Sequence, residues 1–157
     1  DQMIDLMLKR FAEVWNRDFA ELAKEKGLSV YQVVTVASMV EKEAMFDSER
    51  RRIAGVIYNR LREGMLLQVD ATVLYSLGSY KEQVTLKDLE VDSPYNTYRH
   101  TGLPPGPIAS PGAASISAAL QPEEHDYFYY VATRDGHHVF SRTYAEHLRA
   151  KKENQGK

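Results

Sequence analysis

The clearest pattern of apolar and polar positions lies between residues 29 and 44, where an apolar helical run ends in two carboxylates. Ser29 and Gln32 have the Ser-x-x-Gln spacing of a capping box, which predicts that a helix begins near Val30. At about 100° per residue, apolar side chains three and four positions apart share one helix face, which is expected to be buried. The centre of this apolar stripe consists of Val33, Ala37, Val40 and Ala44.

Two glutamates occupy opposite shoulders of that stripe. Glu41 and Glu43 lie roughly 160° apart around the predicted helix axis, whereas Lys42 points toward solvent. A carboxylate beside packed valine and methionine side chains is partly desolvated, and its pKa rises toward the value that a general acid needs near neutral pH. The alternative is an interior glutamate paired with an arginine, because structural ion pairs also perturb pKa values. The candidate partners are Arg50, Arg51, Arg52, Arg60 and Arg62.

The first 27 residues form a segment of their own. Apolar residues recur at helical spacing from Met3 to about Lys26, which predicts one long amphipathic helix, and Gly27 is a typical residue at which to end it. We interpret its apolar face as packing surface. The alternative is a joint to an upstream domain, since a chain that begins with Asp1 rather than methionine is expected to be a fragment.

A second helix is expected directly after the two glutamates. Asp47 or Ser48 is predicted to cap it, and apolar residues at helical spacing carry it to Arg62. The break between the two helices is short, so they must pack closely or turn sharply. Glu43 is therefore expected at the lip of a cleft.

The middle of the chain is predicted to be a short helix followed by a stiff loop. Residues 65–70 read as a brief extended segment in which Gln68 has no evident structural task, and Asp70 is expected to cap a helix over 71–77. Thr85 is predicted to cap a further turn through residue 89. Five of the six prolines fall within 93–112, and proline fixes φ, so this stretch is expected to hold a ligand without much ordering cost.

The last third of the chain predicts a helix, a β-hairpin and a final helix. Ser110 and Pro111 have the form of a cap and a first-turn proline for a helix through Leu120. Alternating residues over 127–132 and 138–141 flank a turn at 133–136 and predict the hairpin. Thr143 is expected to cap a helix that runs into a polar tail over 151–157. The fold class predicted is α+β, a mainly helical single domain over 28–150 with a late hairpin.

Composition fits one globular domain and removes several kinds of chemistry. The chain has 157 residues, of which 43% are hydrophobic and 27% charged, and its net charge of −2 gives no attraction to nucleic acid. It contains no cysteine, which excludes disulfides and thiol nucleophiles. No apolar run reaches the length of a membrane span. Ten tyrosines are many for this length and suit a sugar-binding groove, although tyrosine is also a common core and strand residue.

Carboxylate chemistry is what these exclusions leave. The five histidines show no His-x-x-x-His pair, so we expect neither a metal site nor another cofactor. A Gly-x-Ser-x-Gly elbow and a phosphate-binding glycine loop are also missing from the sequence. Acid-base catalysis by glutamate beside a rigid loop rich in tyrosine and asparagine fits glycoside cleavage best.

Several separate motifs, in order along the chain, resemble one known family. They are Ala37-Ser-Met-Val-Glu-Lys-Glu43, Val56-Ile-Tyr-Asn-Arg-Leu61, Met65-Leu-Leu-Gln-Val-Asp70, Tyr95-Asn-Thr-Tyr98, and Gly102-Leu-Pro-Pro-Gly106 with Ile108-Ala-Ser-Pro-Gly112. Together they are similar to the catalytic domain of the endolytic murein transglycosylases, the YceG-like family, from about Leu28 to Leu148. The resemblance implies a lysozyme-like catalytic helix, and cleavage of MurNAc-β-1,4-GlcNAc bonds within peptidoglycan strands that leaves 1,6-anhydro-MurNAc ends.

The same resemblance implies roles for individual residues. Glu43 matches the catalytic acid of the family, which implies that Glu41 is a supporting residue. One glutamate suffices for this reaction, because the C6 hydroxyl of the sugar replaces water as the attacking group. The candidates for binding the N-acetyl group and the oxocarbenium-like charge are Gln68, Asn96 and Tyr98, with Tyr95, Thr97 and Asn59 as weaker ones. Each of these has a loop-forming or capping interpretation as well.

The resemblance also implies a cellular setting, and two rival functions stay open. Family members carry an N-terminal membrane helix and a LysM-like subdomain, which implies action on glycan strands at the extracytoplasmic face of the bacterial membrane, with peptidoglycan synthases as partners. The first rival is a lysozyme-type muramidase that uses Glu43 as acid and Asp70 as base or nucleophile. The second is a glycan-binding module without catalysis. The three readings differ in the products that they predict.

Overall fold

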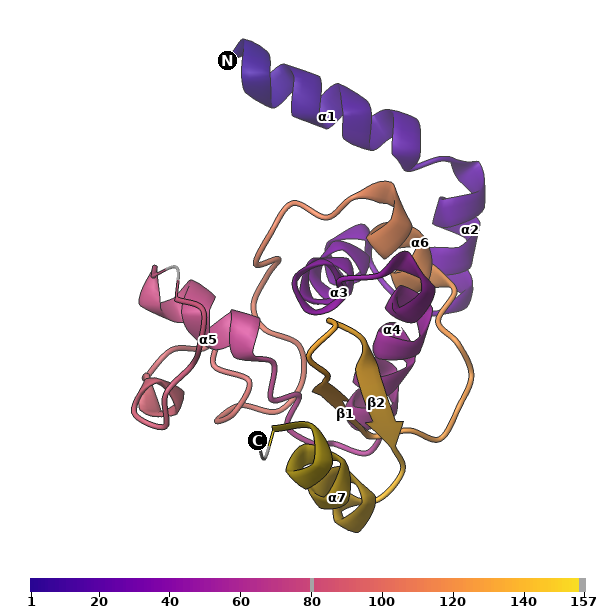
Figure 1. The fold of residues 1–157 in the computed structure, drawn as a ribbon. Coiled ribbons are helices and arrows are strands. Elements are labelled where there is room, and N and C mark those ends of the chain that lie inside the picture. The colour runs from indigo at the N-terminus through magenta and orange to yellow at the C-terminus, as the bar shows by residue number, and fades with distance from the viewer. Residues whose placement is uncertain (80, 156–157) are drawn as a thin grey trace.

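The computed structural model describes residues 1–79 and 81–155, which form one mainly helical α+β unit with a single hairpin near its C-terminal end (Figure 1). The elements in chain order are α1 (Gln2–Val14), α2 (Arg17–Glu25), α3 (Val30–Glu43), α4 (Asp47–Arg62), α5 (Asp70–Leu77), the 3-10 helix η1 (Asp88–Glu90), α6 (Ala113–Leu120), β1 (Tyr129–Ala132), β2 (His138–Ser141) and α7 (Tyr144–Gln155). The predicted fold class is confirmed.

Helix α3 is the centre of the core. Its predicted capping box is present, because the Ser29 hydroxyl accepts from the Gln32 amide and the Gln32 side chain accepts from the Ser29 amide. The predicted stripe is fully buried at Val33, Ala37 and Val40. α4 and α6 pack on this helix, and each buried valine contributes roughly 1.5–3 kcal/mol relative to an exposed one. Figure 1 shows the three helices together, with the hairpin and α7 beside them.

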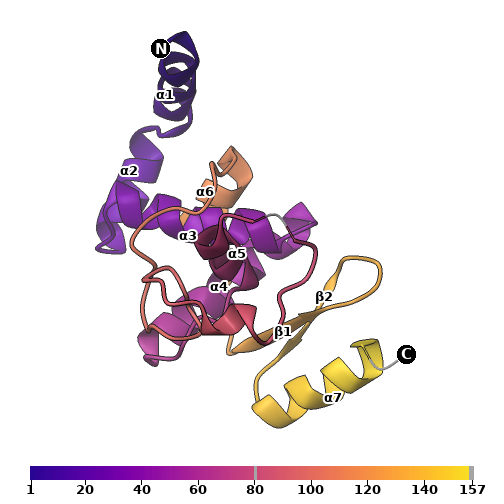
Figure 2. The ribbon, with the colours of Figure 1, turned by 90° about the vertical axis from the view of Figure 1, so that its left-hand side faces the viewer.

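The prediction of one continuous N-terminal helix was wrong. The chain breaks after Val14, and Asn16 caps a second helix by accepting a hydrogen bond from the Phe19 amide. Asparagine favours a cap over a helix interior because its side chain bonds to nearby backbone groups. The two views agree that α1 projects from the body of the molecule, and its apolar face stays largely exposed (Figures 1 and 2). A joint to an upstream domain stays a prediction.

Three predicted helix caps were also wrong. The residue at the cap position of α4 is Phe46, and no side chain makes a cap hydrogen bond there. Asp47 does not cap the helix, and its carboxylate accepts from Arg50 instead. Asp70 lies in the first turn of α5 and not at its cap, since it accepts from a tyrosine described below. α6 begins two residues later than predicted, because Gly112 occupies the cap position in place of Ser110. In the first two cases a contact elsewhere occupies the side chain that the local pattern assigned to the helix end.

The hairpin forms as predicted and packs beside α7. Its strands are antiparallel, with Tyr129 opposite Ser141 and Ala132 opposite His138. Thr143 caps α7, because its hydroxyl accepts from the Glu146 amide while the Glu146 carboxylate accepts from the Thr143 amide. The helix extends through residue 155, so the segment predicted as a polar tail over 151–157 is helical for its described part. The α7 helix lies against both strands.

Candidate active site

Glu43 lies at the C-terminal end of α3, in a cleft of about 390 Å³ between the core and the hairpin. The floor and one side come from α4 and the loop after it, and the other side comes from the hairpin and α7. The lining residues are Glu43, Arg60, Leu67, Gln68, Asp70, Tyr98, Tyr130, Val131, Ala132, His138, Tyr144, His147 and Lys151. The expectation that Glu43 lies at a cleft is therefore confirmed.

The electrostatic surroundings of Glu43 suit a proton donor. The pKa of the Glu43 carboxyl is raised to about 7, mainly by burial and further by the negative charge of Asp70. The hydrogen bond from Tyr130 acts to lower it. The Tyr130 hydroxyl donates that bond to Oε2 over 3.1 Å. A carboxyl group with a pKa near 7 is about half protonated at neutral pH, so it can both give and take a proton.

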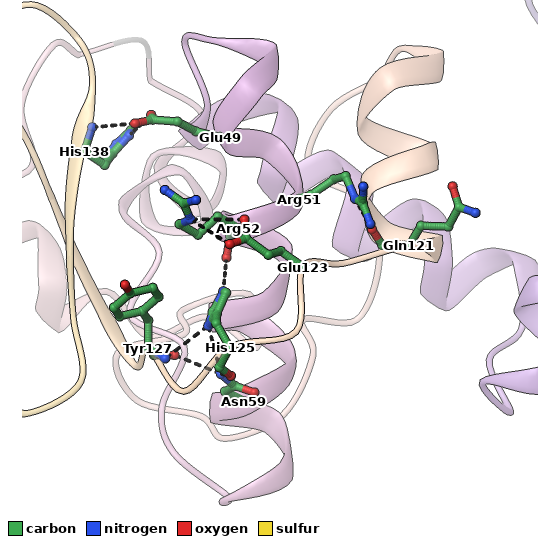
Figure 3. A network of polar contacts seen from close by, with 9 residues as sticks. All are labelled: Glu49, Arg51, Arg52, Asn59, Gln121, Glu123, His125, Tyr127 and His138. Carbon is green, nitrogen blue, oxygen red and sulfur yellow. Dashed lines mark hydrogen bonds and ion pairs between the residues drawn. The ribbon is translucent and has the colours of Figure 1, made fainter.

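The hairpin is held in place so that Tyr130 reaches Glu43. His138 lies edge-on to the Tyr130 ring, with ring centroids 5.3 Å apart. The Glu49 carboxylate at the start of α4 accepts from the His138 amide over 2.9 Å and contacts its Nδ1 over 2.8 Å (Figure 3). Hydrogen bonds with His138 hold the pKa of Glu49 below its usual value, although burial acts to raise it. The carboxylate therefore anchors the hairpin to α4 in its charged form.

The segment that leads into the hairpin is clamped to α4 as well. Arg52 donates to the Glu123 carboxylate, and the Arg51 guanidinium donates to the backbone carbonyl of Gln121 over 2.6 Å (Figure 3). A Cβ atom at Gly55 would lie 2.5 Å from the carbonyl oxygen of Glu123, so this close approach requires glycine. These contacts fix the path of the chain before β1.

Gln68, Asp70 and Tyr98, which were named as candidates from the sequence, line the same cleft as Glu43. The Tyr98 hydroxyl donates to the Asp70 carboxylate, which raises the pKa of Tyr98 together with its burial. Gln68 has a positive φ of 52°, and its backbone amide donates to the backbone carbonyl of Thr97 over 3.1 Å. That strained conformation turns the chain at the floor of the cleft, which an extended segment, as predicted for 65–70, would not do.

Arg60 supports this floor from below. Its guanidinium donates to the carbonyls of Phe128 over 2.6 Å and Leu66 over 2.9 Å, and it lies 5.1 Å from the centroid of the Tyr129 ring. The pKa of Arg60 is lowered by burial, although the nearby tyrosines act to raise it. A guanidinium that donates to several carbonyls ties the hairpin to the turn before α5.

Glu41 lies in a different environment from Glu43. Its Oε2 accepts from the Gly112 amide over 3.2 Å, from the Ser115 hydroxyl and from Arg50 over 3.3 Å. Burial acts to raise the pKa of Glu41, but the two hydrogen bonds and the Arg50 charge hold it below its usual value. Glu41 therefore connects α3 to the start of α6 as a charged group, outside the Glu43 cleft.

Two predicted binding residues lie beneath the loop rather than in the cleft. Asn96 is fully buried, and its Nδ2 donates to the carbonyls of Leu89 and Val91, each over 2.9 Å. The Thr97 hydroxyl, also buried, accepts from the Val69 amide over 2.9 Å. Both side chains satisfy backbone groups of a loop that has few bonds of its own. They hold the cleft floor in shape and do not line it.

Two further candidates lie away from the cleft. Asn59 does not line the cleft, and its side chain donates to the carbonyls of His125 and Tyr127, each over 2.9 Å (Figure 3). The ring of Tyr95 packs against that of Tyr75, with centroids 4.8 Å apart. The structure thus leaves Asn59 and Tyr95 without a direct contact to a ligand beside Glu43.

Sequence reasoning missed the contributions of the hairpin and α7 to the cleft. Tyr130 and His138 come from the hairpin, and Tyr144, His147 and Lys151 come from α7. The period-two pattern could have predicted that Tyr130 and His138 share a face, but not that this face meets α3. Within the described residues, no three histidine or acidic side chains gather as metal ligands would, and no helix is long and apolar enough to cross a membrane.

The chain matches the model of the YceG-like family over residues 1–153. The chain belongs to the YceG-like family. A protein of Bacillus subtilis (strain 168) named endolytic murein transglycosylase is 46% identical over 151 residues, which cover 96% of this chain and 42% of that protein. A protein of the same name from Streptococcus pneumoniae serotype 2 (strain D39 / NCTC 7466) is 34% identical over 164 residues, covering 96% and 29%.

A solved structure shares the fold of this YceG-like chain. The crystal structure of a yceG-like protein from Listeria monocytogenes superposes with a TM-score of 0.81 at 49% identity and covers 84% of this chain and 43% of that one. The chain thus spans less than half the length of the YceG-like relatives that it matches. Family membership and fold are established, whereas the activity of the whole protein is a matter for proposal.

Proposed function

We propose that this domain is a lytic transglycosylase that cleaves the MurNAc-β-1,4-GlcNAc bond within peptidoglycan strands and leaves a 1,6-anhydro-MurNAc end. The observation that carries the proposal is that the carboxyl group of Glu43 lies partly buried in a cleft and has a pKa raised to about 7. The name shared by the curated relatives, endolytic murein transglycosylase, supports the same reaction. Glu41, as a charged structural group, is not available as a proton donor.

The proposed reaction uses Glu43 twice. In its neutral form it donates a proton to the glycosidic oxygen while the bond from that oxygen to C1 of MurNAc breaks, which leaves an oxocarbenium-like sugar. The resulting carboxylate then accepts the proton of the C6 hydroxyl as that oxygen bonds to C1. The anhydro ring closes, Glu43 is neutral again, and no water is consumed.

Neighbouring groups stabilise the two protonation states of Glu43 in turn. The hydrogen bond from Tyr130 favours the carboxylate that remains after the first proton transfer. The negative charge of Asp70 favours the neutral acid beforehand and, in the same cleft, a developing positive charge on the sugar. Gln68 and Tyr98 remain our candidates for orienting the N-acetyl group, because both line the cleft beside Asp70.

A lysozyme-type muramidase is the second candidate, and one observation favours it. Asp70 lies near enough to Glu43 to raise its pKa, so a pair of carboxylates is present in one cleft. In that reading Asp70 acts as base or nucleophile and water completes the reaction, which leaves reducing ends. The two reactions differ in their products and not in their acid.

Mass spectrometry of the soluble products from peptidoglycan tests the proposal. We expect anhydro-muropeptides from this chain, none from the Glu43→Gln variant, and products from the matched Glu41→Gln variant if it is folded. Reducing ends would establish the muramidase. Binding of glycan without any product from the unmodified chain would indicate a binding module.

The setting of the reaction is part of the proposal. Peptidoglycan strands lie outside the cytoplasmic membrane, so we place the activity at the extracytoplasmic face of that membrane. A membrane anchor and a peptidoglycan synthase partner follow from the family resemblance alone. Both stay predictions for the whole protein.

A further inference from the structure

The α7 side of the cleft carries side chains that the proposed reaction does not use. Tyr144, His147 and Lys151 follow one another at spacings of three and four residues, and all three line the cleft opposite the end of α3. The two carboxyl groups of the cleft, Glu43 and Asp70, come from the other side. The cleft therefore has two carboxyl groups on one side and the ammonium group of Lys151 on the α7 side.

Lys151 is the uncommitted cation of this cleft. Within residues 1–79 and 81–155 its ammonium group has neither a hydrogen bond nor an ion pair, and the side chain is exposed. The guanidinium of Arg60, by contrast, is occupied by the carbonyls of Phe128, Leu66 and Leu67. Of these two cations, only Lys151 can take up an anion without giving up an existing bond.

His147 offers a second donor next to this lysine. Its Nδ1 is buried and has no hydrogen-bond partner among the described residues, while its ring stacks on Tyr129 with centroids 5.2 Å apart. Burial lowers the pKa of His147, and the charges of Lys151 and Arg60 lower it further, so the ring is neutral at pH 7. A ligand in the cleft cannot reach the buried Nδ1, but Nε2 is not buried in this way, so a neutral ring that carries its proton on Nε2 can donate a hydrogen bond to the ligand.

We propose that Lys151 and His147 form a carboxylate-binding subsite of the Glu43 cleft, which takes an acidic group of the peptidoglycan strand. This inference rests on the proposed function, since it names a feature of that substrate. Two carboxylates of peptidoglycan have the required chemistry: the free lactyl group of a peptide-free MurNAc, and a carboxylate of a stem peptide. Repulsion from the Asp70 carboxylate directs either one toward α7, so the subsite fixes which way the strand lies.

Binding to the inactive Glu43→Gln variant tests this subsite without turnover. Three ligands of equal length are compared by calorimetry: peptide-free glycan strands, strands with stem peptides, and neutral chitooligosaccharides that lack the lactyl group. Lys151→Ala in this background should weaken binding of one carboxylate-bearing ligand about fivefold, the upper range for an exposed charge pair. Lys151→Arg should restore the affinity, and chitooligosaccharide binding should not change.

Two variants serve as controls for charge and packing. Lys152→Ala removes the same charge from the next position of α7, but Lys152 does not line the cleft, so the affinities of this variant should equal those of the parent. His147→Phe keeps an aromatic ring on Tyr129 while it removes both ring nitrogens. It should weaken only the ligand that Lys151→Ala weakens.

The outcomes identify the source of the carboxylate or overturn the subsite. A loss confined to peptide-free strands assigns the subsite to the lactyl group, and a loss confined to peptide-bearing strands assigns it to the stem peptide. Equal effects of Lys151→Ala and Lys152→Ala, or an equal loss for chitooligosaccharides, would overturn the inference. Anhydro products from the parent in that case would leave the proposed function intact, whereas a lysine-dependent loss without any anhydro product would refute that function alone.

Discussion

Replacing Tyr130 with phenylalanine should raise the pKa of Glu43 by roughly one unit. The Tyr130 hydroxyl donates a 3.1 Å hydrogen bond to Glu43, and this bond favours the charged form of a carboxyl group whose pKa is about 7. A hydrogen bond to a charged group contributes about 1.5 kcal/mol, and 1.36 kcal/mol corresponds to one pKa unit. The pKa of Glu43 in the variant should therefore be about 8.

The pH dependence of kcat for the release of soluble glycan fragments measures this shift. The neutral acid is the active form, so activity falls as the pH rises through the pKa of Glu43, and this alkaline limb should move upward by roughly one unit in the variant. Tyr127→Phe is a matched control, because its hydroxyl has no hydrogen bond in the described part of the chain. A limb that stays in place or moves to lower pH would refute the reasoning.

Three further predictions follow from the same site. Glu43→Gln should raise the free energy of unfolding at pH 8 by about 1 kcal/mol or more, and this gain should vanish at about pH 4. The native pKa of Glu43, about 7, exceeds the unfolded value of 4.5, so the unmodified chain loses stability as the pH rises from 4.5 to 7. Asp70→Asn removes a charge that raises the pKa of Glu43, so the alkaline limb of the pH profile of kcat should move to lower pH while mass spectrometry still detects anhydro products. Complete loss of turnover in a folded variant would support the muramidase. Glu49→Ala should cost about 1–3 kcal/mol in urea denaturation, because His138 loses both acceptors, and a cost near zero would contradict its anchoring role.

The helix that carries Glu43 could be predicted because its determinants are local. The Ser29–Gln32 capping box and the stripe with a helical period both lie between Ser29 and Ala44, and the structure contains the capping box and buries the stripe. The same periodicity missed the break at Asn16, because the apolar pattern continues through it while a single capping side chain ends the helix. A period reports which face is buried and not whether the helix is continuous.

The composition of the cleft depends on contacts between distant parts of the chain, which local patterns do not encode. Tyr130 follows Glu43 by 87 positions, and α7 lines the cleft only because it packs beside the hairpin. Asn96 and Thr97 were predicted as binding residues because they are polar and lie on a stiff loop. Such a loop has backbone groups to satisfy, and these side chains satisfy them. Polar residues in loops without secondary structure should therefore be assigned first to the loop.

The most direct test of the central claim, that the sugar's own hydroxyl replaces water, is digestion of peptidoglycan in water labelled with heavy oxygen. Glu43 acting alone as acid and then base predicts MurNAc ends that carry no label and have the mass of the anhydro form. Labelled reducing ends formed by the enzyme would contradict the account and assign the second step to water, with Asp70 as its activating carboxylate.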